Sequence, residues 1–309
     1  MLFKKDIVLK DNLKTALNEE HKGFVGYTHW LIAVACFLLM WVIPNKFSSG
    51  FINAIASSWA FAFLIFFVIG GGSLLPDLDS AIEQGGGSAA IYQLGFIGHL
   101  LSLLCVTISG VFYSIFHTKY DKKPKSQHRM LFHAPIIPIL IFIYSNWMIP
   151  VNESNLWHNI KNIDYAGIIV LVFFAGCCIY LGANMFFYKT LSLINKHWYT
   201  SKICTGIMII SIIYMFTVSF DKLRLIGIAM SLGYLFHVLS DVFTKGSAPL
   251  FFPIPIPSEL TPPGKFRFWW HPYIISSKFT VTTGSVINII LNFALIGLDI
   301  FLAWFIFFR

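Results

Sequence analysis

The chain has 309 residues, of which 57% are hydrophobic and only 12% are charged. Soluble domains carry about twice that charged fraction, so the composition excludes a water-soluble protein and favours an all-α, polytopic membrane protein. The net charge of +8 indicates membrane-flanking loops rich in Lys and Arg rather than a nucleic-acid surface. The five cysteines lie in apolar runs without C-x-x-C spacing, so neither a disulfide framework nor a thiolate zinc site is expected.

The N-terminal residues 1–25 are polar and rich in lysine. No apolar core and small-residue cleavage site follow in signal-peptide order, so we expect a retained cytoplasmic segment. Residues 26–309 then form one membrane-embedded domain. Its first apolar run, 27–43, ends at Pro44 and places His29 in the first helical turn. A single histidine there is, by itself, more often an interfacial side chain than a ligand.

A second apolar run, 51–75, is followed by Pro76, Asp77 and Asp79. We expect Pro76 to end the helix and an extended segment to follow, in which the two carboxylates converge on a cation. The alternative is a solvated helix terminus. Against it, negative charge is unfavourable at a helix C-terminus, and the next Lys or Arg in the sequence is Lys119.

The remaining apolar runs determine the topology. They span residues 91–116, 131–149, 165–188, 203–220, 223–243 and 284–308. If the run 91–116 does not cross the membrane, 17 of the 22 Lys and Arg residues fall on one side; if it crosses, the division is 13 against 9. The positive-inside rule therefore favours about seven transmembrane helices plus one re-entrant or interfacial helical segment at 91–116.

The run 223–243 contains His237 and Asp241, four residues apart. On a helix this spacing places both side chains on one face, one turn apart. Such a pair inside a membrane helix is costly unless its members share a proton, a metal or a partner. A hydrogen bond that only holds two helices together is the alternative interpretation.

With the favoured topology, four histidines and three aspartates lie at the cytoplasmic ends of their helices. They are His29, Asp77, Asp79, His128, His133, His237 and Asp241. Imidazole and carboxylate ligands suit Zn, Mn, Fe or Mg, and seven ligands are enough for two ions. A divalent metal ion there would acidify a bound water and polarise an ester or phosphoryl oxygen. His128 and His133 can both contribute if a helix begins between them, and Arg129 could hold an anionic substrate group.

Four blocks of the sequence carry a resemblance to a known family. They are Gly-Tyr-Thr-His at 26–29, Leu-Leu-Pro-Asp-Leu-Asp at 74–79, His-Arg-x-x-x-His at 128–133, and the stretch 232–253 around His-x-x-x-Asp. In this order they resemble the signature of the YdjM-like metal-dependent hydrolases of bacterial inner membranes. The resemblance implies a multi-pass inner-membrane hydrolase with the seven residues at its centre. Met130, Phe132 and Ala134 depart from the family pattern, in which Gly, Thr and Ser stand at these positions.

Three hypotheses follow. The first is a membrane-embedded hydrolase that attacks a phosphoester or ester of a lipid-like or membrane-associated substrate at the cytoplasmic face, with His29, His128 and Arg129 in catalytic roles. The second is a metal or proton transporter, although a transporter would place ionisable groups near the bilayer midplane. The third is a non-enzymatic protein that binds a cytoplasmic partner through its basic segments, which more often lie solvated beside anionic lipid.

Overall fold

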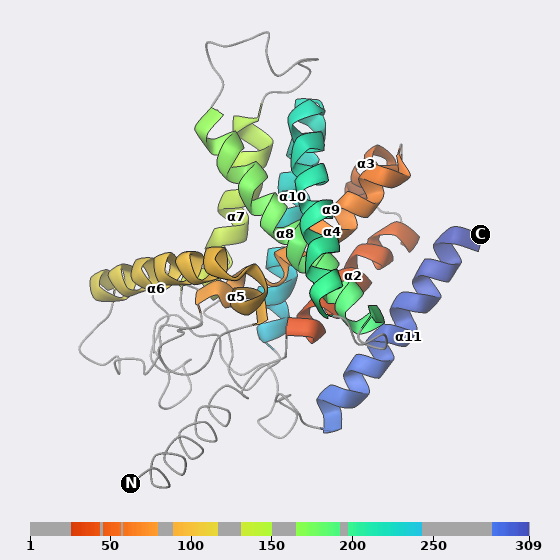
Figure 1. Cartoon of the computed structure of the whole chain (residues 1–309). Helices are drawn as coiled ribbons and strands as arrows, with labels where there is room; N and C mark the ends of the chain where they lie inside the picture. Colours follow the sequence, from red (N-terminus) through yellow and green to blue (C-terminus); the bar gives the residue numbers. More distant parts are fainter. Residues whose placement is uncertain are drawn as a thin grey trace, which may run out of the picture. The chain divides into compact units, whose positions relative to one another are not determined.

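The computed structural model describes residues 26–43, 46–56, 58–79, 89–116, 131–149, 165–191, 197–242 and 286–308. Within these ranges the secondary structure is helical throughout and contains no β-strand (Figure 1). Five stretches are long and apolar enough to cross a membrane: Trp59–Asp79, Tyr165–Phe187, Thr200–Thr217, Phe220–Asp241 and Ile287–Ile306. These helices define an all-α membrane protein, whereas the expected total of seven spans stays a prediction.

The chain divides into two compact units. Unit 1 comprises residues 1–28, 76–135 and 238–292, and unit 2 comprises residues 29–75, 136–237 and 293–309. The helices described wholly within unit 1 are η1 (Pro76–Asp79), α5 (Ala89–Leu94), α6 (Phe96–Phe116) and η3 (Leu131–His133). The long helix α6 packs against each of the other three, so it is the framework of unit 1.

The predicted apolar segment 91–116 is two helices. Gly95 separates α5 from α6 and has a φ of 57°, a left-handed conformation that is strained for residues with a Cβ. Beyond the turn, Gly98 lies against the backbone of Ile91, where an added Cβ would come within 2.9 Å of the carbonyl carbon. The α6 helix therefore folds back onto α5 instead of continuing its direction.

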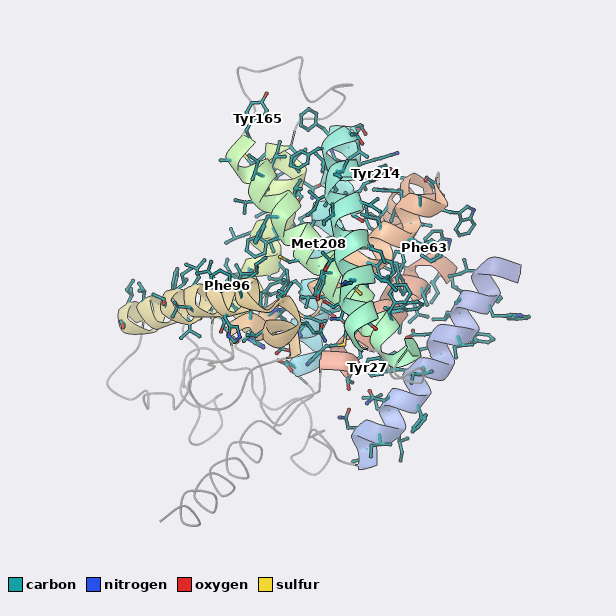
Figure 2. All side chains as sticks on the ribbon, viewed as in Figure 1. Tyr27, Phe63, Phe96, Tyr165, Met208 and Tyr214 are labelled. Atoms are coloured by element: carbon teal, nitrogen blue, oxygen red, sulfur yellow. The ribbon has the colours of Figure 1, made fainter. Side chains whose placement is uncertain are left out.

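Unit 2 contains the remaining helices in whole or for most of their length. They are α2 (Gly26–Val42), α3 (Lys46–Ala56), α4 (Trp59–Gly72), α7 (Ile136–Ile143), the π-helical turn η4 (Tyr144–Met148), α8 (Tyr165–Leu191), α9 (His197–Thr217), α10 (Phe220–Asp241) and α11 (Val286–Phe308). Helix α8 packs along both α4 and α9 (Figure 1). Met208 and Tyr214 lie on α9 (Figure 2), whose exposed side chains include Ile210 and Ile213, as expected of a helix in contact with lipid.

The second apolar run of the sequence is likewise not continuous. Helix α3 ends at Ala56, and α4 begins at Trp59 behind an N-cap at Ser58, whose side chain accepts a hydrogen bond from the Phe61 amide. At its other end, α4 stops at Gly72. Pro76 does not terminate this helix but opens the 3₁₀ turn η1, where its missing N–H costs nothing. The extended segment expected around Asp77 was therefore a wrong prediction.

Glycines allow three helices of unit 2 to pack backbone against backbone. A Cβ added to Gly71 of α4 would overlap the Cys178 carbonyl of α8, and one added to Gly233 of α10 would overlap the Ile69 carbonyl of α4. Small residues permit this close approach of membrane helices, which is stabilised by dispersion contacts rather than by a difference in hydrophobicity. The approach fixes α10 against the C-terminal end of α4.

Candidate metal centre

A buried histidine and three carboxylates form the chemical centre of unit 1. His133 closes the 3₁₀ turn η3 and is completely buried. Its Nδ1 lies 3.3 Å from Oδ2 of Asp79, while its Nε2 lies 3.7 Å from Oδ1 of Asp77 and 3.5 Å from Oδ2 of Asp241. Asp79 and Asp241 are also completely buried, and the Asp77 side chain is 16% exposed. Both edges of one imidazole therefore face carboxylates.

The cluster places one imidazole among three carboxylates in a largely buried setting. Burial alone disfavours the imidazolium form of His133, but the carboxylates of Asp79, Asp77 and Asp241 outweigh burial and raise its pKa from 6.5 to about 9. The three carboxylates therefore favour a positive charge at the position of His133.

The distances around His133 match the spacing of metal ligands. A four-coordinate ion with bonds of about 2.0–2.1 Å holds neighbouring ligand atoms roughly 3.3–3.4 Å apart. The separations from Nε2 to Asp241 and Asp77, 3.5 and 3.7 Å, are close to this value. On the other edge, Nδ1 donates its hydrogen to the Asp79 carboxylate. A metal-bound histidine commonly donates its second N–H to a carboxylate, which fixes the ring orientation.

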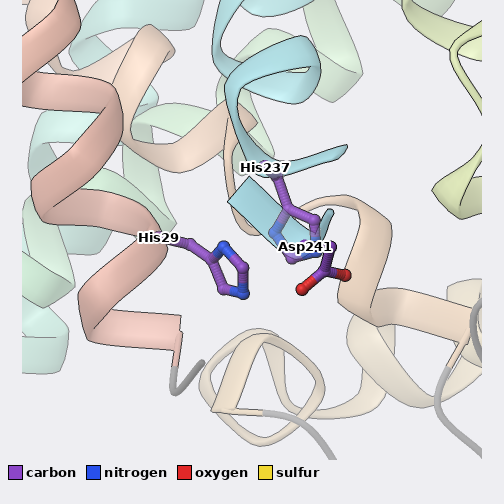
Figure 3. Close-up of side chains that lie close together, drawn as sticks. All are labelled: His29, His237 and Asp241. Carbon is purple, nitrogen blue, oxygen red and sulfur yellow. The ribbon is translucent and has the colours of Figure 1, made fainter. Parts of the chain in front are cut away.

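Two further buried histidines lie together in unit 2. The rings of His29, on α2, and His237, on α10, stack with their centroids 3.8 Å apart and their planes 22° apart (Figure 3). The Nδ1 of His237 lies 2.6 Å from the Ser73 carbonyl oxygen, which only accepts, so Nδ1 carries the hydrogen. In the neutral ring this hydrogen bond leaves the lone pair on Nε2, the atom available for a ligand contact.

Helix α10 links His237 to Asp241. The helix is continuous from one residue to the other and ends at Asp241, so their placement one turn apart follows from the helix itself (Figure 3). The buried histidine and aspartate groups of this chain could therefore hold a metal ion.

The predicted site residues fall into three groups. Asp77, Asp79, His133 and Asp241 come together in unit 1, and His29 and His237 come together in unit 2. His128 and Arg129 lie outside the described residues, as do the N-terminal segment and residues 243–285. That all seven predicted ligands share one pocket stays a prediction.

The sequence reasoning missed Ser73. Its carbonyl oxygen orients His237, and its hydroxyl donates to the Gly70 carbonyl at 2.6 Å. Every residue type has a backbone carbonyl, so the sequence does not identify Ser73 as the acceptor. The only signal was the run of glycines that precedes it.

Comparison of the chain with protein-family models, with curated proteins and with solved structures finds no match. A functional assignment therefore depends on the chemistry of the residues themselves.

Proposed function

We propose that this protein is a metal-dependent hydrolase of the bacterial inner membrane that cleaves a phosphoester or ester bond in a lipid-like or membrane-associated substrate at the cytoplasmic face. The observation that carries the proposal is the surrounding of His133 by three carboxylates, two of them completely buried, at ligand-like distances. Imidazole and carboxylate are ligands that suit a divalent cation such as Zn, Mn, Fe or Mg. The resemblance of four sequence blocks to YdjM-like hydrolases supports the same assignment.

Each described residue of the unit 1 cluster has a role in this proposal. His133 binds an ion through Nε2 together with Asp77 or with Asp241, and Asp79 orients the His133 ring through Nδ1. When bound, the ion supplies Lewis acidity toward the scissile group. The Nε2 edge of His133 is thus the metal-binding edge, and the Nδ1 edge is the one that Asp79 orients. The residue types alone do not reveal this difference.

The two stacked histidines provide the remaining chemistry. His237 is held by the Ser73 carbonyl and belongs to the same helix as Asp241, so it suits a ligand role, including at a second ion. His29 lies beside it in the first turn of α2 and suits proton transfer to or from the substrate. We assign the same role to His128, and to Arg129 the binding of an anionic substrate group.

The position of these residues along their helices favours hydrolysis over transport. Asp241 is the last residue of α10, His29 is the fourth of α2, and Asp77 and His133 lie in short 3₁₀ turns. Transport pathways usually place ionisable groups near the bilayer midplane, at the middle of spanning helices. Groups at helix ends are better placed for a reaction at the membrane surface.

Metal analysis of the purified protein tests the proposal. We expect bound divalent metal in the wild type and a loss of most of it in the double variant His133→Ala with Asp241→Ala. Asp221→Asn, an exposed carboxylate in the first turn of the same helix α10, is the matched control and should retain wild-type metal. Helix content and gel-filtration behaviour identify any variant that does not fold. Equal metal content in folded wild type and double variant would refute the assignment, as would absence of metal-dependent cleavage of chromogenic phosphoesters and esters.

A further inference from the structure

Helix α6 connects the carboxylate–histidine cluster to the surface of unit 1. Its inner face includes the buried residues Leu101, Ser102 and Cys105, and the helix packs directly on η1 and η3, the two turns that carry Asp77, Asp79 and His133. Burial and, to a smaller extent, the Asp79 carboxylate raise the pKa of the Cys105 thiol to about 12. One helix thickness, about 10 Å, therefore separates the cluster from whatever covers the outer face of α6.

The outer face of α6 is a largely apolar stripe. Its exposed apolar side chains form two sets on the same side of the helix, separated by the exposed Thr107: Phe96, Leu100, Leu103 and Leu104, then Val111 and Ile115. Phe96 is 81% and Leu103 is 64% exposed, and Figure 2 shows Phe96 at the start of this helix. No Asp, Glu, Lys or Arg occurs between residues 96 and 116. This spacing places the stripe on one side of the helix.

The hydroxyl groups near this stripe form hydrogen bonds within their own helix, as polar groups in contact with hydrocarbon must. The Thr107 hydroxyl donates to the Leu103 carbonyl at 2.7 Å, and the Ser114 hydroxyl donates to the Gly110 carbonyl at 2.9 Å. Both exposed hydroxyls thus find acceptors within their own helix, where lipid could offer none. In the sequence, α6 is followed at once by four lysines and Arg129 between 119 and 129, a composition that attracts anionic headgroups.

We infer that the substrate is an anionic, long-chain phosphoester lipid whose acyl or alkyl chain lies along the outer stripe of α6 while its phosphoester reaches the cluster past the edge of this helix. The inference rests on the proposed function and narrows it, because it selects the phosphoester over the carboxylic ester and the lipid over a soluble molecule. The apolar stripe contributes chain recognition.

Two substrates with the same scissile bond test this inference. Hexadecyl p-nitrophenyl phosphate and ethyl p-nitrophenyl phosphate release the same chromophore and differ only in chain length. Each buried methylene is worth roughly fourfold in affinity, so the reconstituted wild type should favour the hexadecyl substrate by at least about tenfold in kcat/KM. The double variant Leu100→Ser with Leu103→Ser should lower this preference about fivefold or more.

A second apolar face provides the matched control. Ile210→Ser with Ile213→Ser changes two similarly exposed residues on α9, of which Ile210 is 69% exposed, and should leave the chain-length preference at its wild-type value. Equal wild-type rates on both substrates, or an equal loss of preference in the α6 and α9 variants, would overturn the inference while leaving the hydrolase proposal standing.

If the wild type cleaves neither phosphodiester, the proposed phosphoester activity fails, and binding is then decided by photolabelling. A hexadecyl phosphate carrying a diazirine on its chain should label α6 more than α9, and unlabelled hexadecyl phosphate should compete. Equal labelling of the two helices would overturn the α6 binding surface.

Discussion

Replacing Gly233 by alanine tests whether the backbone contact between α10 and α4 orients His237. The added Cβ would overlap the Ile69 carbonyl oxygen and would lie 2.9 Å from its carbonyl carbon and 3.0 Å from its Cα, where ordinary contacts are 3.4–4 Å. Because these atoms belong to the backbone, they cannot rotate away. Relief therefore requires α10 to move from α4 by about 0.5 Å or more.

That displacement acts directly on His237, which lies one turn beyond Gly233 on the same face of α10. A shift of about 0.5 Å would lengthen the Nδ1–O distance to Ser73 from 2.6 Å toward the limit of a hydrogen bond. Overpacking costs roughly 1–3 kcal/mol, and the better helix propensity of alanine returns about 1 kcal/mol. Loss of the orienting hydrogen bond should weaken metal binding by about 10–100-fold.

The assay combines thermal unfolding in detergent with a metal titration, using Gly206→Ala as the control. Gly206 lies in α9 with nothing within 4 Å of an added Cβ, so this variant should be as stable as the wild type or slightly more stable and should bind metal normally. If Gly233→Ala matches Gly206→Ala in both stability and metal affinity, the argument that the glycine contact orients His237 is wrong.

Three further outcomes follow from the unit 1 cluster. Asp79→Asn should keep the metal stoichiometry but weaken affinity about 10–100-fold in a competition with a chelating dye, because it removes only the group that orients His133; complete loss of metal would make Asp79 a ligand instead. A saturating metal at 100 times its Kd should raise the unfolding free energy by about 2.7 kcal/mol over chelator-treated protein, and a melting temperature independent of metal concentration would contradict this. In the metal-free protein, the raised pKa of His133 stabilises the fold below pH 6.5, so this stability should be lost as pH rises through about 9; His133→Gln should show a flatter pH profile.

The residue types of this chain were enough to predict a helical membrane protein and the histidines and aspartates that become buried. Six of the seven predicted ligands lie in the described residues, and each has another predicted ligand beside it. The reason is that burying an ionisable side chain alone in an apolar environment is costly. The histidines and aspartates of a largely apolar sequence are therefore expected to be buried beside one another.

Helix boundaries were harder to predict because apolar composition is the same on both sides of each break. The run 51–75 contains no charged residue, and only the cap at Ser58 separates its two helices. The turn at Gly95 depends on a single left-handed residue in a segment with several other glycines. The separate roles proposed for Asp77 and Asp79 depend on which nitrogen of His133 each faces, which is a property of three-dimensional geometry alone.

The glycine contacts that join α4, α8 and α10 bear on how the protein responds to its bilayer. Membrane helices adjust to a thinner or thicker hydrocarbon layer by tilting. Helices in backbone contact have no intervening side chains to rearrange, so these three should tilt together as one body. The hydrogen bond from His237 to Ser73 lies within that body, and its geometry should therefore be insensitive to changes in lipid chain length.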